Sequence, residues 1–235
     1  MDNWLRIGRF TQNFCYLCGL ENPAGADLCQ GCRHDLPRIR HACQQCGLPI
    51  SAASQYAHCG QCQKTSPPFE HTLSAYIYAE PLKQLITRMK FSGNLALARL
   101  LGQILCDELG DKIVANCPEA ILPVPLHNKR IRQRGFNQAI ELARPLAKHL
   151  GIPLLIDAVE RRVDTPSQTG LGKLQRRANL RRAFRICREL PYQHIAIVDD
   201  VITTGQTVTA LATCLNKAGI KRIDCWSVAR ALPAK

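Results

Sequence analysis

Hydrophobic residues follow two alternating spacings from about residue 73 onward. Short apolar runs, of which His194-Ile-Ala-Ile-Val198 is the clearest, predict buried strands. Between these runs, apolar residues recur every three or four positions, which predicts amphipathic helices. The expected strands span residues 73–78, 120–124, 154–159, 183–187, 194–198 and 222–229, and the expected helices span residues 81–90, 95–109, 136–150 and 206–218. Strands that alternate with helices favour an α/β fold with a mostly parallel sheet and helices on both faces.

The first 69 residues follow neither spacing. They are rich in Cys, Gly, Gln and Pro and poor in Ile, Val and Leu, so they lack the apolar side chains that a conventional core needs. Pro67 and Pro68 end this segment as an extended linker. We therefore expect two domains, a cysteine-rich head over residues 1–69 and an α/β domain over residues 70–235.

Cysteine spacing predicts metal sites in the head. Eight of the 13 cysteines form four Cys-x-x-Cys pairs, and the amino terminus has no apolar segment typical of a secretion signal, so we expect reduced thiols. Two such pairs close one tetrahedral Zn²⁺ site with no open position, which makes the zinc structural. The expected ligands are Cys15, Cys18, Cys29 and Cys32 for one ion and Cys43, Cys46, Cys59 and Cys62 for a second.

Spacing leaves some alternatives to this double zinc-ribbon head open. The two quartets could interleave, and Cys-x-x-Cys pairs also occur in redox and iron–sulfur proteins. His34 and His58 lie beside the cysteine pairs and could replace a thiolate, but with eight thiols present they are better explained as surface residues.

The segment from Ile195 to Thr207 predicts a site for phosphate and ribose. It joins a buried strand to two adjacent acids and then to a Thr/Gly loop that enters a helix. Ligands of open α/β sheets bind beyond the carboxyl ends of strands, and loop amides with a helix amino terminus attract phosphate. Carboxylates accept hydrogen bonds from ribose hydroxyls. The expected binding residues are Asp199, Asp200, Thr203, Thr204, Gly205, Gln206 and Thr207.

An earlier strand leads into basic residues that could bind pyrophosphate. Arg130 and Arg134 follow the strand expected at residues 120–124, and guanidinium groups match phosphate oxygens in bidentate pairs. A solvated basic turn before a helix would explain the same residues. His127 could equally be a structural hydrogen-bonding group or a catalyst.

Positive charge is concentrated in the expected α/β domain. The net charge is +13, of which +1 lies before residue 72 and +12 after it. This excess favours a polyanionic partner or a phosphate-rich ligand. The stretch 161–188 holds nine basic residues. Its loop-like centre could close as a flap over pyrophosphate, its arginines could follow a nucleic-acid backbone, or they could form a solvated face. Flap candidates are Lys173, Arg176 and Arg177, and DNA-binding candidates are Arg161, Arg162, Arg176, Arg177, Arg181 and Arg182.

Several motifs together resemble the ComF/GntX family of competence and DNA-utilisation proteins. They are Pro123-Val-Pro-Leu126, Arg134-Gly-Phe-Asn-Gln138, Thr165-Pro-Ser-Gln-Thr169, Arg176-Arg-Ala-Asn179 and the loop after Asp199, all behind the cysteine-rich head. The loop itself resembles the phosphoribosyl pyrophosphate (PRPP) signature of type I phosphoribosyltransferases. By that resemblance, Asp199 and Asp200 would contact the ribose hydroxyls. The family resemblance implies a bacterial, cytoplasmic protein with a phosphoribosyltransferase-like domain and a link to the uptake of external DNA.

Three functions fit these expectations. The first is a DNA-uptake accessory that binds incoming single-stranded DNA at the inner side of the membrane, beside the uptake machinery, and carries a PRPP pocket. The alternative is an active salvage phosphoribosyltransferase, with Mg²⁺ bridging PRPP oxygens, although neither a base-recognition hood nor a general base is identifiable. A zinc-ribbon regulator on an inactive scaffold would leave the intact acids unexplained. No stretch approaches the roughly 18 apolar residues of a membrane span, so we expect a cytoplasmic protein without a transmembrane segment.

Overall fold

The computed structural model describes residues 14–22, 27–52, 54, 56–114, 116–163 and 183–233. The chain forms two compact units, Met1–Leu36 and Pro37–Lys235. The second cysteine quartet therefore shares one unit with the α/β fold. The boundary expected between residues 69 and 70 marks a change in composition and stays a prediction.

The smaller unit is built around the first cysteine quartet. Phe14 and Glu21 form an antiparallel bridge on either side of the Cys15–Cys18 turn, and the five-residue helix α1 (Gln30–His34) starts after Cys29. Few apolar side chains are buried here. Cys15 and Leu28 are among them, as the composition of the head predicts.

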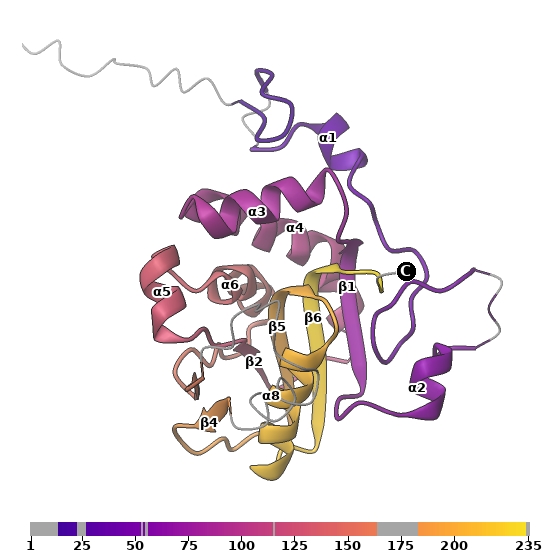
Figure 1. The fold of residues 1–235 in the computed structure, drawn as a ribbon, viewed down its shortest axis with the longest axis vertical. Helices are drawn as coiled ribbons and strands as arrows, with labels where there is room; N and C mark the ends of the chain where they lie inside the picture. Colours follow the sequence, from indigo (N-terminus) through magenta and orange to yellow (C-terminus); the bar gives the residue numbers. More distant parts are fainter. Residues whose placement is uncertain are drawn as a thin grey trace, which may run out of the picture. The chain divides into compact units, whose positions relative to one another are not determined.

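A four-stranded parallel sheet forms the centre of the larger unit (Figure 1). Its order is β1 (His71–Ile77), β6 (Arg222–Arg230), β5 (His194–Ile202) and β2 (Ala120–Pro123). Burial on both faces requires nearly continuous apolar strands. Strand β5 meets this requirement with the buried run Ile195 to Val198.

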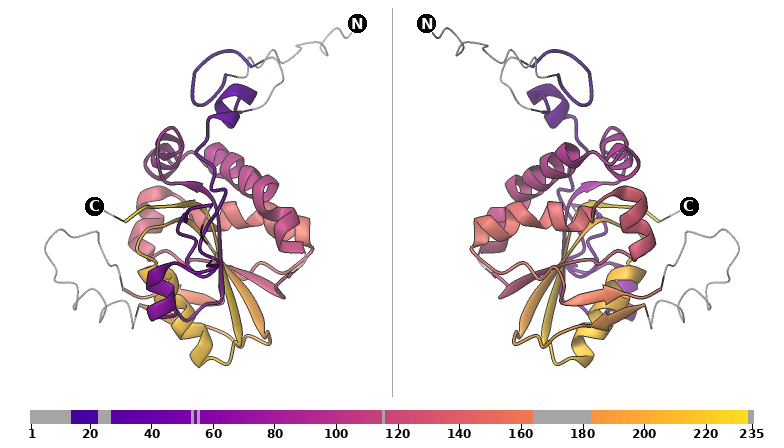
Figure 2. Two further views of the ribbon diagram at one scale, coloured as in Figure 1. Left: turned by 90° about the vertical axis from the view of Figure 1, so that its right-hand side faces the viewer. Right: turned by 90° about the vertical axis from the view of Figure 1, so that its left-hand side faces the viewer.

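Helices cover both faces of the sheet. Helix α8 (Gln206–Lys217) lies on the opposite face from α4 (Leu95–Val114) and α6 (Gln138–Leu150) (Figure 2). Side chains of β5 and α8 share one apolar cluster, in which Ile195 and Ile197 pack with Val208, Leu211 and Leu215. A short antiparallel pair, β3 (Val159–Arg161) with β4 (Phe184–Ile186), lies outside the main sheet, and β4 contacts α8.

The outer edge of β1 is covered by the chain that carries the second quartet. The Ile39 N–H donates to the Ala75 carbonyl at 3.0 Å, and the Ile77 N–H donates to the Pro37 carbonyl at 2.8 Å. An uncovered edge strand would offer unpaired backbone groups to other chains. The segment before the second quartet thus protects this sheet edge, and the short helix α2 (Gly60–Lys64) completes the ribbon.

Most expected elements are present, with three differences. Residues 128–134, expected as a basic loop, form helix α5 (Asn128–Arg134), which ends at Gly135 in the left-handed conformation. Strand β5 continues to Ile202, so both acids lie within the strand rather than after it. In the stretch 154–159, only Leu154 pairs with the sheet, through a bridge to Ile121.

The remaining helix, α3 (Leu82–Phe91), buries the four apolar residues expected from its spacing. Within the described ranges, no helix combines the length and the apolar character needed to cross a membrane.

Candidate ligand site and metal centres

The second quartet has the geometry of a closed tetrahedral zinc site. The four sulfur atoms of Cys43, Cys46, Cys59 and Cys62 lie within 4.8 Å of one another, and the Cys46 and Cys59 sulfurs are 3.6 Å apart. Zn–S bonds of about 2.3 Å in a tetrahedron place sulfurs roughly 3.8 Å apart. The donor set fits zinc and leaves no position for a substrate.

Backbone amides favour the thiolate form of Cys43 in this quartet. The Cys59 N–H donates to Cys43 Sγ at 3.2 Å. Burial alone would raise the pKa of the Cys43 thiol, but N–H donors from Cys59, Cys46 and Gln45 lower this pKa to about 7. A deprotonated sulfur is the form that binds metal.

The first quartet repeats this design in the smaller unit. The sulfurs of Cys15, Cys18, Cys29 and Cys32 also lie within 4.8 Å of one another, with 3.9 Å between Cys18 and Cys29. The Cys29 N–H donates to Cys15 Sγ at 3.4 Å. The quartets are therefore sequential, and the interleaved arrangement is wrong. Neither His34 nor His58 belongs to either group.

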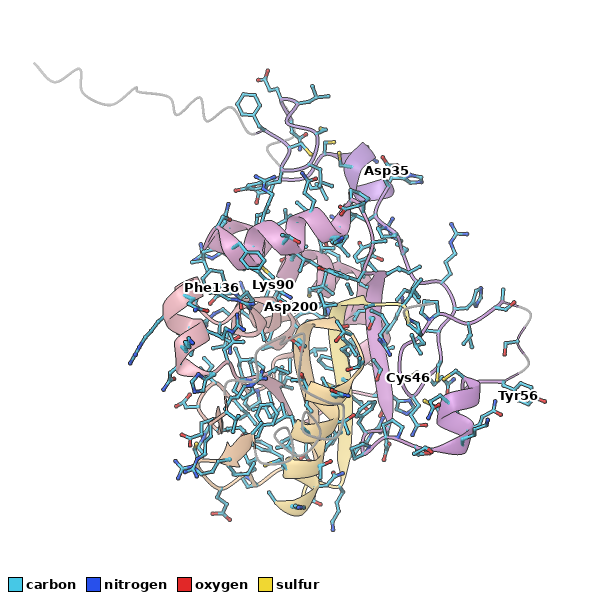
Figure 3. The ribbon with its side chains drawn as sticks, viewed as in Figure 1. Asp35, Cys46, Tyr56, Lys90, Phe136 and Asp200 are labelled. Carbon is cyan, nitrogen blue, oxygen red and sulfur yellow. The ribbon has the colours of Figure 1, made fainter. Side chains whose placement is uncertain are left out.

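A polar cavity of about 100 Å³ lies at the carboxyl end of β5. Asp199 and Asp200 form one wall, and Lys90 from α3 reaches in so that its Nζ is 3.0 Å from Asp200 Oδ1. Figure 3 shows Lys90 beside Asp200 at this edge of the sheet. The cavity is lined by Lys90, Val124, Leu126, Arg134, Asn137, Gln138, Ala139, Arg161, Asp199, Asp200 and Thr207.

The loop after β5 borders a second, smaller hollow next to this cavity. Thr203, Gly205, Gln206 and Thr207 line it together with Asp199 and the flanking apolar residues. Gly205 caps the start of α8 with a φ of 76°, a left-handed backbone conformation that residues other than glycine rarely adopt. The positive end of the α8 dipole and the loop amides therefore meet beside the two acids.

Arg134 and Asn137 enter the cavity from the α5–α6 turn. Burial lowers the pKa of Arg134, while the charge of Asp200 opposes that shift. Asn137 Nδ2 donates to the Val124 carbonyl at 3.1 Å, and its Oδ1 caps α6 by accepting from the Ala139 N–H. These hydrogen bonds connect the end of β2 to the start of α6 and so position the turn that carries Arg134.

The other basic residue expected at this turn, Arg130, does not line the cavity. His127 Nδ1 accepts from the Lys129 N–H at 3.3 Å and caps α5, which matches the structural interpretation of this residue.

Two cations of the cavity were not expected there. Lys90 follows the apolar pattern of α3, and no local signal connects it to residues more than a hundred positions later. Arg161, expected to contact DNA, lines the cavity and lies over the Phe184 ring at 5.7 Å. Both placements arise from the packing of separate elements.

The basic stretch is only partly within the described residues. Lys173, Arg176, Arg177, Arg181 and Arg182 lie outside them. Arg162 is described and pairs with Glu160 at 2.7 Å, and Arg185 pairs with the same carboxylate at 2.9 Å.

Known proteins match both parts of the chain. A double zinc ribbon domain matches residues 10–63, and a phosphoribosyl transferase domain matches residues 137–233. The chain thus carries two Cys₄ zinc sites and a phosphoribosyltransferase-like fold.

Relatives match nearly the whole chain. Competence protein F of Haemophilus influenzae is 38% identical over 87% of this chain and 90% of its own length. DNA utilization protein YhgH of Escherichia coli K12 is 35% identical over 93% of this chain and 97% of its own length. Competence protein ComFC of Bacillus subtilis is 28% identical over 82% of this chain and 79% of its own length. Among solved structures, an orotate phosphoribosyltransferase from Aeropyrum pernix aligns with 60% of this chain and 75% of its own, at 16% identity and a TM-score of 0.36.

We expect the purified full-length protein to hold two zinc ions per chain, because each quartet supplies four sulfurs at tetrahedral spacing. Replacing Cys59 and Cys62 by Ser should reduce the zinc content to one ion, and replacing Cys18 and Cys29 by Ser should do the same independently. Elemental analysis by mass spectrometry measures both. One zinc or fewer in the wild type, or iron in its place, would show that the duplicated ribbon is misassigned.

Asp199 generates a prediction about stability. Burial and the neighbouring Asp200 carboxylate raise the pKa of Asp199 from 3.8 to about 7, while Lys90 opposes the shift. The folded chain keeps this proton at pH values where the unfolded chain has released it. The free energy of unfolding should therefore fall as the pH rises from about 4 through 7. Because Asp199→Asn removes this loss, its melting temperature should exceed that of the wild type by more at about pH 8 than at about pH 5.

The matched control for this measurement is Asp157→Asn, which changes an exposed acid away from the cavity. Its melting temperature should differ from that of the wild type by the same amount at both pH values. If the melting temperature of Asp199→Asn differs from that of the wild type by the same amount at both pH values, the raised pKa of Asp199 is contradicted.

Proposed function

Because this chain belongs to the ComF/GntX family of competence and DNA-utilisation proteins, we propose that it acts inside the cell in the uptake or use of external DNA. In this proposal the chain binds single-stranded DNA and holds a phosphoribosyl ligand of the PRPP type. One observation carries the ligand assignment: a pair of acids, the loop after β5 and partly buried cations line two adjoining hollows.

Each part of a phosphoribosyl ligand has a complementary group in these two adjoining hollows. The 5′-phosphate would accept hydrogen bonds from the loop amides and from the hydroxyls of Thr203, Thr204 and Thr207 at the start of α8. The ribose hydroxyls would donate to Asp199 and Asp200. The whole set of proposed ligand-binding residues is Asp199, Asp200, Thr203, Thr204, Gly205, Gln206 and Thr207.

The pyrophosphate would lie toward the half-buried guanidinium of Arg134. Arg134 Nη1 already donates to Gln138 Oε1 at 3.0 Å, which holds the side chain in place while leaving other N–H groups to pair with phosphate oxygens. Arg161 is a second cation on the same cavity. Arg130, which lies outside the lining, is the weaker pyrophosphate candidate.

The donor set of the cavity is compatible with Mg²⁺. Magnesium takes oxygen ligands and is bound through a few carboxylates together with substrate phosphates. Asp199 and Asp200 could hold it directly or through water, and the ion would neutralise charge on the pyrophosphate. The Lys90 ammonium, 3.0 Å from Asp200, balances one of the two carboxylates and fixes its position.

A second candidate function is transfer of the phosphoribosyl group to a nucleobase. The observation that favours it is Asp199, whose raised pKa of about 7 suits a group that accepts a proton from the attacking base. Pyrophosphate would leave from the ribose as the base nitrogen bonds to it. Release of pyrophosphate from PRPP in the presence of a base would distinguish this enzyme from a protein that only binds the ligand.

DNA binding is supported by charge and by the names of the relatives. The excess of +12 after residue 72 raises the local potential for a polyanion. Arg161 and Arg162 are less suited to DNA than expected, because one lines the cavity and the other pairs with Glu160. Arg176, Arg177, Arg181 and Arg182 remain the main candidates in this proposal.

Replacing Asp199 and Asp200 together by Asn should weaken binding of Mg²⁺-PRPP by roughly 100-fold or more, because two hydrogen bonds to charged groups are lost. The fold should remain intact. Isothermal titration calorimetry measures the affinity. The control, Asp107→Asn with Asp111→Asn, removes the same charge from exposed positions on α4 and should bind as the wild type does. Equal affinity of the cavity variant and the wild type would contradict the assignment.

Binding of single-stranded DNA should depend strongly on salt. If four to six phosphates are contacted, log K should fall with log salt at a slope of roughly −3 to −4. Replacing Arg176, Arg177 and Arg181 by Ala should flatten the slope by about two units if all three contact phosphate. Fluorescence anisotropy with a labelled oligonucleotide measures this slope.

The control for the DNA experiment replaces Lys112, Lys148 and Lys217 by Ala. These exposed lysines lie in the last turns of α4, α6 and α8, away from the carboxyl edge of the sheet. Their loss removes equal charge and should flatten the slope much less. A wild type without salt-dependent binding at about 50 mM salt would contradict DNA handling.

A further inference from the structure

Arg230 is a buried cation that does not line the ligand cavity. It is the last residue of β6 and is 5% exposed, and burial lowers its pKa. A buried guanidinium is stable only when its N–H groups are paired. The partners of Arg230 therefore indicate what it is for.

Four backbone carbonyls accept hydrogen bonds from this guanidinium, and the Cys46 side chain also interacts with it. Nε donates to the Cys46 carbonyl at 2.8 Å. Nη1 donates to the carbonyls of Ile202 and Ala231, both at 2.9 Å, and to that of Thr203. One side chain thus joins Cys46 of the second zinc quartet to Ile202 and Thr203. At these two residues β5 ends and the loop of residues 203–205 begins, which we call the phosphate loop.

The Cys46 carbonyl is held on a rigid turn. Cys46 Sγ is one of the four zinc ligands, and the Gly47 N–H donates to the Cys43 carbonyl at 2.9 Å to close the turn. The Gln45 carbonyl accepts from Thr72 Oγ1 at 2.7 Å. A Cβ on Gly47 would lie 2.7 Å from Thr72 Cγ2, so the turn packs tightly on β1. Zinc bound to the sulfur fixes this carbonyl against the sheet.

The loop carbonyls that Arg230 holds determine where loop amides point. In a trans peptide, the C=O and the following N–H lie in one plane and point in opposite directions. Anchoring the Ile202 and Thr203 carbonyls on Arg230 therefore directs the N–H groups of Thr203 and Thr204 away from it. Among the described residues, no hydrogen bond engages these two N–H groups. They are available to a phosphate at the start of α8.

We propose that Arg230 is a positioning residue that couples the second zinc centre to the phosphate loop. Zinc on Cys43, Cys46, Cys59 and Cys62 fixes the Cys46 carbonyl, Arg230 transmits that position, and the loop amides are held ready for phosphate. The effect on PRPP affinity rests on the function proposed above. The effect on amide exchange in the ligand-free loop is independent of that function.

The coupling is specific to one of the two zinc centres. The four bonds of Arg230 all lie within the unit Pro37–Lys235, whereas the first quartet belongs to the unit Met1–Leu36. The two quartets share ligand type and geometry, so the first serves as an internal control. Arg222, at the other end of β6, is the control for Arg230. It donates to Asn116 Oδ1 at 2.7 Å and pairs with Glu70 and Asp224, and within the described part of the chain no contact joins it to residues 203–207.

The experiment compares full-length variants without ligand by hydrogen–deuterium exchange. Arg230→Lys keeps the charge but cannot reproduce the planar fork that holds these carbonyls. It should speed amide exchange in residues 203–207 while two zinc ions remain bound. Replacing Cys59 and Cys62 by Ser should have the same effect. Residues 195–198 in the middle of β5 serve as the reference for global unfolding.

The same variants are then titrated with Mg²⁺-PRPP. Loss of a buried hydrogen-bonding network to a charged group should weaken binding about tenfold or more in Arg230→Lys and in the Cys59/Cys62 variant. Combining the two changes should weaken binding little further, because both act through one connection. The Cys18/Cys29 variant and Arg222→Lys should bind as the wild type does.

The outcomes separate this inference from the proposed function. A wild type that fails to bind PRPP contradicts the proposed function, and loop exchange then still decides the coupling. The coupling is contradicted if Arg230→Lys leaves amide exchange in residues 203–207 unchanged. It is also contradicted if Arg230→Lys and the Cys59/Cys62 replacement have additive effects on PRPP affinity. The coupling is also contradicted if the Cys18/Cys29 variant, which loses the first zinc, speeds amide exchange in residues 203–207 as much as the Cys59/Cys62 variant does.

Discussion

Parallel pairing of β2, β5 and β6 is the constraint on which the site depends. Parallel strands bring their carboxyl ends to one edge of the sheet, and the helices that follow them start at that edge. The acids of β5 and the amino terminus of α8 therefore meet the turn before α6, which lies much earlier in the sequence. Packing on both sheet faces keeps the register fixed, since a shift by one residue would move each side chain to the opposite face, where it would pack against different helices.

Zinc has two different structural roles in this chain. The first ribbon holds together a unit with few buried apolar residues, where metal binding replaces a hydrophobic core. The second ribbon packs against a sheet that has its own core and contributes backbone partners to β1 and Arg230. The first quartet thus takes the place of a hydrophobic core in its unit, whereas the second stabilises a segment that packs against the sheet.

Residues whose placement depends on nearby sequence could be predicted from the sequence. Each cysteine quartet and the Asp199 loop is contained within a few dozen positions, and each strand and helix is marked by the spacing of its own apolar residues. The prediction was less complete where a residue acts across the fold. Lys90 and Arg230 lie in an amphipathic helix and at a strand end, where a basic residue is ordinarily explained by solvent. Asp200 lies more than a hundred positions from Lys90, and Cys46 lies more than a hundred positions from Arg230, so only tertiary packing reveals these contacts. The short helix α5 was missed because five of its seven residues are Lys, Arg or Gln without apolar spacing.

The pairing of residues 37–39 with β1 has a consequence for modularity. A zinc ribbon joined to an enzyme fold through a linker could be exchanged, fused or deleted as a cassette during evolution or in protein engineering. A cut at residue 70 would instead remove the strand-like segment that covers β1 and would leave the sheet open to self-association. Gene fusions that preserve a working fold would have to join at Pro37 and retain the second ribbon with the sheet.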